Sequence, residues 1–129
     1  MLSLVFFTNC NQDNDSNRIE TISGIWNLKN VSGGLQGINI DYNPGEVEWH
    51  FNLDTNILTV ENNSTPAGSK DIYAGLDSGT YSIKVEQNGE TKTLFINNTE
   101  LGVLIFTSTT NLKIDEGLAA DGFIKEFER

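Results

Sequence analysis

Apolar and polar residues alternate with a period of two along much of the chain after residue 20. The clearest example is the segment 46–53, in which Val47, Trp49 and Phe51 share one face while polar residues, His50 among them, occupy the other. Successive side chains of a β-strand point to opposite faces, so this alternation is typical of a strand with one buried side. The segment therefore predicts an antiparallel strand that packs Trp49 and Phe51 into a core.

Similar segments, separated by turn signals, continue to the last residue. Together they predict strands at 25–31, 46–53, 57–62, 80–86, 91–97, 102–109, 111–115 and 123–129. The dipeptide Asn88-Gly89 indicates a hairpin, because a type I′ turn needs a positive φ at both central residues. Longer loops are expected at 32–45, 63–77 and 116–122. No segment shows the sustained 3.6-residue period of a capped amphipathic helix.

Eight consecutive antiparallel strands leave two sheet edges that must be protected from pairing with other chains. Closure of the sheet into a barrel removes both edges. We therefore expect an all-β fold, an eight-stranded antiparallel up-and-down β-barrel, with a sandwich or an open meander as the alternative. The 129 residues are about the commonest size for one domain.

Charge and composition exclude several classes of function. The chain carries 18 acidic against 8 basic residues, a formal net charge of −10, which argues against nucleic-acid binding because neutralising phosphates requires clustered Lys and Arg. The single cysteine, Cys10, cannot form an intramolecular disulfide, and the single histidine, His50, cannot complete a Cys/His metal site. His50 is expected to be a solvated surface residue. We therefore predict neither enzymatic activity nor a cofactor or metal.

The first ten residues form a short apolar run that ends at Cys10, and the residues that follow, 11–20, are polar and charged. The apolar run is too short to span a bilayer. This boundary resembles the end of a truncated bacterial lipoprotein signal peptide followed by the tether of a Bacteroidetes-type surface lipoprotein. The resemblance implies that segment 1–10 is the signal, that Cys10 carries a lipid anchor, and that 11–20 is a flexible tether before the folded domain, 21–129. The protein would then lie in the cell envelope as an outer-membrane lipoprotein, facing the periplasm or the cell surface.

The two ends of the folded part carry a recognisable pair of features. A Gly-x-Trp sequence, Gly24-Ile25-Trp26, opens the first strand, and Arg129 ends the last. This combination resembles the lipocalin (calycin) pattern. The resemblance implies that Trp26 plugs the closed end of a barrel and that Arg129 packs across its ring. Gly24 would let the chain turn tightly into the strand.

The interior of such a barrel is either filled by side chains or open to one small ligand. We expect a lipocalin-like protein that binds a small apolar ligand in the barrel. The candidate lining residues are Trp49, Phe51, Tyr81, Ile83, Phe106 and Phe123. The alternative is a solid barrel, an interaction or structural protein of the envelope that contacts a protein partner through loops 32–45, 63–77 and 116–122.

Overall fold

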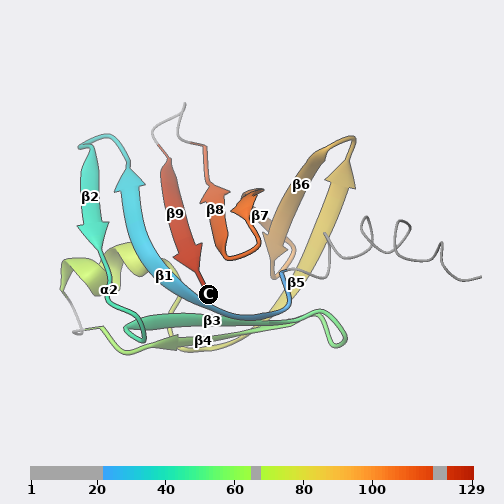
Figure 1. Cartoon of the computed structure of the whole chain (residues 1–129), viewed down its shortest axis with the longest axis horizontal. Coiled ribbons are helices and arrows are strands. Elements are labelled where there is room, and N and C mark those ends of the chain that lie inside the picture. Colours follow the sequence, from blue (N-terminus) through green and yellow to red (C-terminus); the bar gives the residue numbers. More distant parts are fainter. Residues whose placement is uncertain (1–21, 65–67, 118–121) are drawn as a thin grey trace, which may run out of the picture.

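The computed structural model describes residues 22–64, 68–117 and 122–129. Nine strands and one short helix follow one another along these residues. They are β1 (Gly24–Gly33), β2 (Ile38–Asp41), β3 (Val47–Asn52), β4 (Ile57–Asn62), α2 (Ser69–Ala74), β5 (Gly79–Asn88), β6 (Thr91–Ile96), β7 (Thr99–Ser108), β8 (Asn111–Asp115) and β9 (Phe123–Glu128) (Figure 1).

Eight of the strands close into an antiparallel barrel. From β3 to β9 each strand pairs with its neighbour in the sequence, and β9 returns to pair with β1. Strand β1 pairs with three other strands. Along one edge, residues 24–27 pair with β3 and residues 30–33 pair with β2. Along its other edge, β1 pairs with β9. The predicted all-β, eight-stranded up-and-down barrel is confirmed.

Strand β2 lies inside the segment 32–45, which the sequence predicted to be a loop. It has four residues, and its register places Val31 opposite Ile40 and Ser32 opposite Asn39. Four residues between glycine-rich turns are too few for the alternation to stand out. The strand is fixed by its backbone ladder to the second half of β1, which only the fold brings into register.

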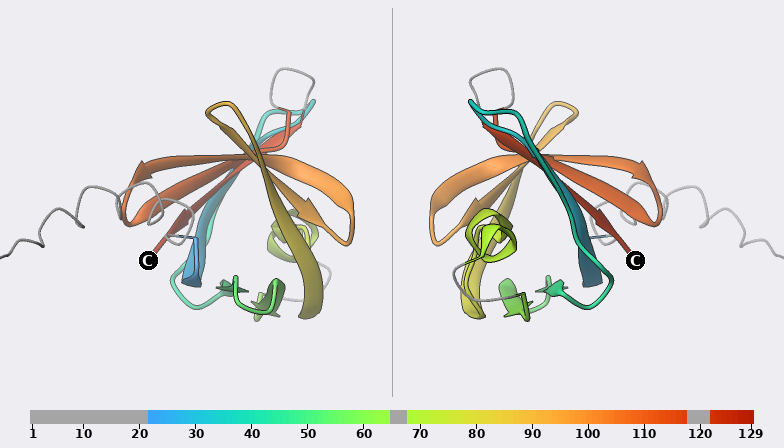
Figure 2. Two further views of the ribbon diagram at one scale, coloured as in Figure 1. Left: turned by 90° about the vertical axis from the view of Figure 1, so that its right-hand side faces the viewer. Right: turned by 90° about the vertical axis from the view of Figure 1, so that its left-hand side faces the viewer.

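Helix α2 lies inside the second predicted loop, 63–77. An isolated helix of six residues is unstable in water, so it depends on tertiary contacts rather than on its own periodicity. Ala74 is buried in the core, and the Tyr42 hydroxyl donates a hydrogen bond to the Lys70 carbonyl at 2.8 Å. Figure 2 shows α2 within the opening framed by the strands.

The hairpin turn between β5 and β6 departs from the predicted geometry. Asn88 pairs with Thr91, so the turn residues between β5 and β6 are Gly89 and Glu90, and of these only Gly89 has a positive φ, +64°. A positive φ at the first central position alone is the type II′ arrangement, not type I′. The type I′ signature instead occurs between β6 and β7, where Asn97 and Asn98 have φ values of 51° and 68°.

The two ends of the barrel differ because of this strand order. One end holds the start of β1, the end of β9 and the short turns that follow β3, β5 and β7. The other end holds the β1–β2 hairpin, helix α2 and the connection from β8 to β9. The core between them is built mainly from inward-facing strand residues, with Trp26, Trp49 and Phe127 its largest fully buried side chains.

Candidate functional site

Trp26 and Arg129 meet at the end of the barrel that carries the short turns. The guanidinium carbon of Arg129 lies 4.2 Å from the centroid of the Trp26 ring, and the ring is fully buried. A cation over an indole face is attracted by the electron-rich face of the ring. Burial lowers the pKa of Arg129 from its ordinary value. The structure therefore places Arg129 across the ring of Trp26.

Hydrogen bonds fix both members of this pair. Arg129 donates from Nη1 to the Ser23 carbonyl at 2.9 Å and from Nε to the Thr109 carbonyl at 3.1 Å. The Trp26 indole N–H donates to the Ile22 carbonyl at 2.9 Å. Gly24 has a φ of +113°, and a Cβ at this position would lie 3.7 Å from Arg129 Nη1. The glycine thus allows the chain to enter β1 in a conformation that L side chains rarely adopt.

The six candidate lining residues do not share one environment. Trp49, Phe51 and Ile83 are buried in the core. The Trp49 ring packs against Phe51 at 6.1 Å between centroids, and against Phe127 at 4.9 Å.

Tyr81, Phe106 and Phe123 are only partly buried. The Tyr81 hydroxyl donates to the Asp77 carbonyl at 2.6 Å. Phe106 packs against Trp26 at 6.3 Å between ring centroids, and Phe123 packs against Tyr73 of α2 at 5.6 Å.

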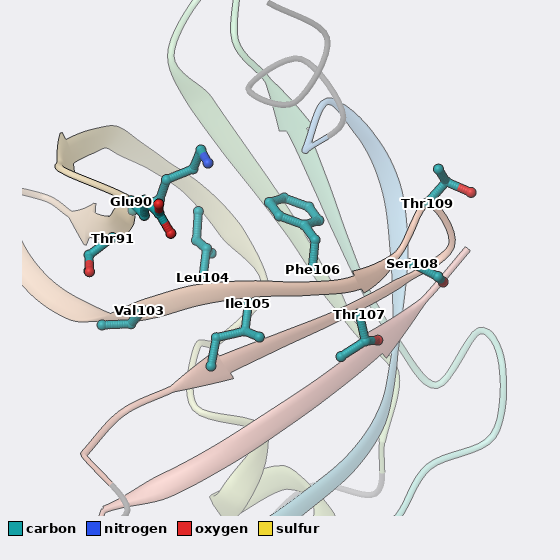
Figure 3. Close-up of a pocket in the computed structure, with 10 residues that line it drawn as sticks. Glu90, Thr91, Val103, Leu104, Ile105, Phe106, Thr107, Ser108 and Thr109 are labelled. Carbon is teal, nitrogen blue, oxygen red and sulfur yellow. The ribbon is translucent and has the colours of Figure 1, made fainter. Parts of the chain in front are cut away.

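A groove of about 650 Å³ follows the second half of β7. Residues 103–108 of β7 and Thr109 of the following turn form one wall. Glu90 of the β5–β6 turn and residues 91–92 at the start of β6 form the other. Figure 3 shows Leu104 and Phe106 projecting to one side of β7, and Ile105 and Thr107 to the other. Of the six predicted lining residues, Phe106 borders this groove.

The groove exists because β6 is shorter than β7. The last paired positions are Lys92 and Leu104, whereas β7 continues to Ser108 and pairs there only with β8. Residues 105–108 therefore offer an open strand edge beside the apolar side chains. Lys92 shares the inward face with Leu104, its cross-strand partner, and Glu90 lies close by in the turn. The groove is lined by apolar side chains together with charged and hydroxyl groups.

Trp49 carries an unsatisfied polar atom in the core. Its indole N–H is buried and has no hydrogen-bond partner among the described residues. A buried donor without an acceptor typically costs about 1–3 kcal/mol, so native proteins rarely leave one unpaired. Trp49 is one of the predicted lining residues, but it does not border the groove beside β7.

The opposite end of the barrel is covered by α2 and the β1–β2 hairpin. The buried Lys125 ammonium pairs with Glu116 below the helix, and it lies beside Gly75 at the helix C-terminus. A second, smaller pocket of about 240 Å³ lies between Leu35, Tyr73 and Phe123.

Parts of the three loops predicted to contact a partner are described at this end. Leu35, in the segment 32–45, is 84% exposed, and Ile72, in 63–77, is 64% exposed. Residues 65–67 and 118–121 of these loops lie outside the described residues, and so do Cys10 and the tether.

The groove residues of β6 and of the β7 edge were not predicted from the sequence. The segment 102–109 signalled an apolar strand, but nothing in its pattern indicated where pairing with β6 would stop. That boundary depends on the position of the Gly89–Glu90 turn.

A scan against models of protein families, a search of curated proteins and a search of solved structures found no match to this chain. In the part of the chain that the structure describes, no helix has the length and apolar character needed to cross a bilayer.

Proposed function

We propose that this protein is an exported, lipid-anchored binding protein whose lipocalin-like barrel holds a small amphipathic molecule in the groove beside β7. The observation that carries this proposal is the groove itself, about 650 Å³ in volume, with Leu104 and Phe106 in its walls. Pockets for small ligands are typically about 300–1,000 Å³ and mostly apolar, with a few polar groups that orient the ligand.

The charged and hydroxyl side chains of the groove indicate the ligand class. Lys92, Thr91 and Thr107 supply hydrogen-bond donors near the apolar walls. An acyl or aromatic body would pack on Phe106 and Leu104 while a carboxylate or other polar head group binds these donors. A fatty acid or a similar lipophile satisfies both requirements.

Fluorescence titration tests this proposal. An apolar naphthylamine fluorophore should bind the wild-type protein saturably, and dodecanoate should displace it. Phe106→Ala should weaken binding because it removes one groove wall, whereas Phe95→Ala should not, because Phe95, also partly buried, faces Lys84 instead. Thermal unfolding of both variants controls for loss of fold. Absence of saturable binding to wild type, or equal loss in both variants, would reject the ligand proposal.

The exposed apolar side chains at the opposite end favour the second candidate function. Leu35 and Ile72 border the covered end of the barrel, and Trp49 packs against Phe127 in the core with 4.9 Å between ring centroids. A solid barrel that contacts a protein partner through this end is therefore the account that remains if the groove binds no lipophile.

The lipid anchor is the second part of the proposal, and it rests on the apolar-to-polar boundary at Cys10. When the protein is expressed behind a complete lipoprotein signal peptide, we expect it in the membrane fraction. Cys10→Ala should release it into the soluble fraction, while Ser3→Ala, a substitution within the same apolar run, should not. Membrane retention of the Cys10→Ala variant would contradict lipidation at this residue.

A further inference from the structure

Three potential metal ligands lie together on the outer face of the β3–β4 hairpin. Glu48 and His50 are two residues apart on β3, so their side chains leave the same face of the sheet. Glu61 on β4 is the direct cross-strand partner of Glu48. The three ligand atoms, one from each side chain, lie within 4.8 Å of one another.

The histidine connects the two carboxylates. His50 Nε2 lies 3.1 Å from a Glu48 oxygen and 4.0 Å from a Glu61 oxygen. All three side chains are accessible, with 31%, 28% and 54% of the side-chain surface of His50, Glu48 and Glu61 exposed. An ion from solvent can therefore reach the space between them.

The positions that flank this cluster supply no positive charge. In the β-ladders, Ile25 of β1 and Thr59 of β4 lie opposite His50, and Asn27 lies opposite Glu48. Two carboxylates directly opposite each other on neighbouring strands repel. In the described part of the chain, the ion pairs recorded for Glu48 and Glu61 are both with His50, which is charged only when protonated.

We propose that Glu48, His50 and Glu61 bind one divalent transition-metal ion, of which Zn²⁺ is the best match. Imidazole nitrogen and carboxylate oxygen are both zinc ligands, at about 2.0–2.2 Å, which places neighbouring ligand atoms about 3.2–3.6 Å apart in a tetrahedral site. The two distances to His50 Nε2 bracket this spacing. Small rotations of the exposed Glu61 side chain bring its oxygen into range.

The proposed site has consequences for the barrel. The ion neutralises the facing pair of carboxylates and links β3 to β4. Three protein ligands leave a fourth position for water, as in zinc sites that retain an open position. Because the ion binds the folded arrangement, it should also raise the stability of the protein by mass action.

Calorimetric titration with ZnCl₂ tests this proposal directly. The full chain should carry Cys10→Ser, because a free thiolate elsewhere is itself a zinc ligand. We expect one ion per chain. His50→Ala and Glu61→Gln should each weaken binding at least about tenfold, because even loss of an outer-shell partner typically costs about 10- to 100-fold in metal affinity.

Two controls distinguish this site from binding by the acidic surface. Glu100→Gln removes the same charge from β7 and should leave zinc affinity unchanged, and MgCl₂ should not compete at equal concentration. Substitution by Co²⁺ should give the intense visible absorption of a four-coordinate ion in the parent protein and not in His50→Ala. The proposal is overturned if zinc binds the parent and His50→Ala with the same affinity, or if the parent binds no zinc.

Discussion

The indole of Trp26 is held from two sides by groups at opposite ends of the described chain. The Ile22 carbonyl accepts its N–H, and the Arg129 guanidinium covers its face. Arg129 also donates hydrogen bonds to the carbonyls of Ser23 and Thr109. Its side chain therefore connects the end of β9 to the residue before β1 and to the β7–β8 turn. This residue-level arrangement joins the first and last strands of the barrel at the end that carries the short turns.

Replacing Trp26 and Arg129 by alanine should lower the free energy of unfolding by unequal amounts. Trp26→Ala should lower the free energy of unfolding by about 3–5 kcal/mol, the usual range for large buried aromatic residues. Arg129→Ala should cost less, about 0.5–2 kcal/mol, as expected for a cation stacked on an aromatic ring. Urea unfolding measures both. Lys113→Ala, which removes an exposed pair with Glu126, is the control and should cost no more than about 1 kcal/mol. An Arg129→Ala cost below about 0.5 kcal/mol would contradict this account.

At the scale of elements, helix α2 is held to the barrel by side chains rather than by its own sequence. Lys70 of the helix forms an ion pair of 2.6 Å with Glu46 and lies over the Tyr42 ring at 5.7 Å. Burial, with the nearby negative charges of Glu46 and Asp71, raises the pKa of Tyr42 to about 12. These contacts join α2 to the segment that leads from β2 into β3.

The Glu46 contact makes part of the stability depend on pH. The hydrogen bond from Lys70, and then that from the Asn43 backbone, lowers the pKa of Glu46. A carboxyl group whose pKa is lower in the folded than in the unfolded state stabilises the fold above its unfolded pKa, and this contribution is lost as pH falls through the folded value. Wild type should therefore be more stable than Glu46→Gln at neutral pH, and the difference should shrink on acidification.

Urea unfolding at a series of pH values checks this expectation. In a Lys70→Met background, the change in unfolding free energy caused by Glu46→Gln should depend less on pH, because the main cause of the lowered pKa is gone. If the effect of Glu46→Gln on the unfolding free energy depends on pH as strongly in that background as in wild type, Lys70 is not the main cause of the lowered pKa of Glu46.

The elements themselves were predictable where they are long and half-buried. The alternation in 46–53 and 80–86 anticipated β3 and β5, because one face of each strand packs on the core. Strand β2 was missed because four residues show too little alternation, and helix α2 was missed because six residues make fewer than two helical turns. The hairpin between β5 and β6 was predicted, but its turn lies one residue later than expected. Asn88 belongs to the ladder, and only Gly89 of the two turn residues has a positive φ.

At the scale of the whole molecule, closure of the barrel follows from strand number and order, and both could be predicted. The groove could not, because it arises from a difference in length between β6 and β7 that emerges only when the strands are in register. Predicted lining residues such as Trp49 and Phe51 were correctly placed on inward faces, yet they pack against each other in the core. Periodicity indicates which face a residue occupies, but not whether neighbouring side chains fill the space in front of it.

The central claim is that the groove beside β7 is a ligand site, and methyl NMR during titration with dodecanoate tests it most directly. The account predicts saturable, one-to-one shifts of the methyl groups of Val103, Leu104 and Ile105, with Leu58 of β4 unaffected. Shifts confined to Leu35 and Ile72 at the opposite end of the barrel, or no saturable shifts at all, would contradict it.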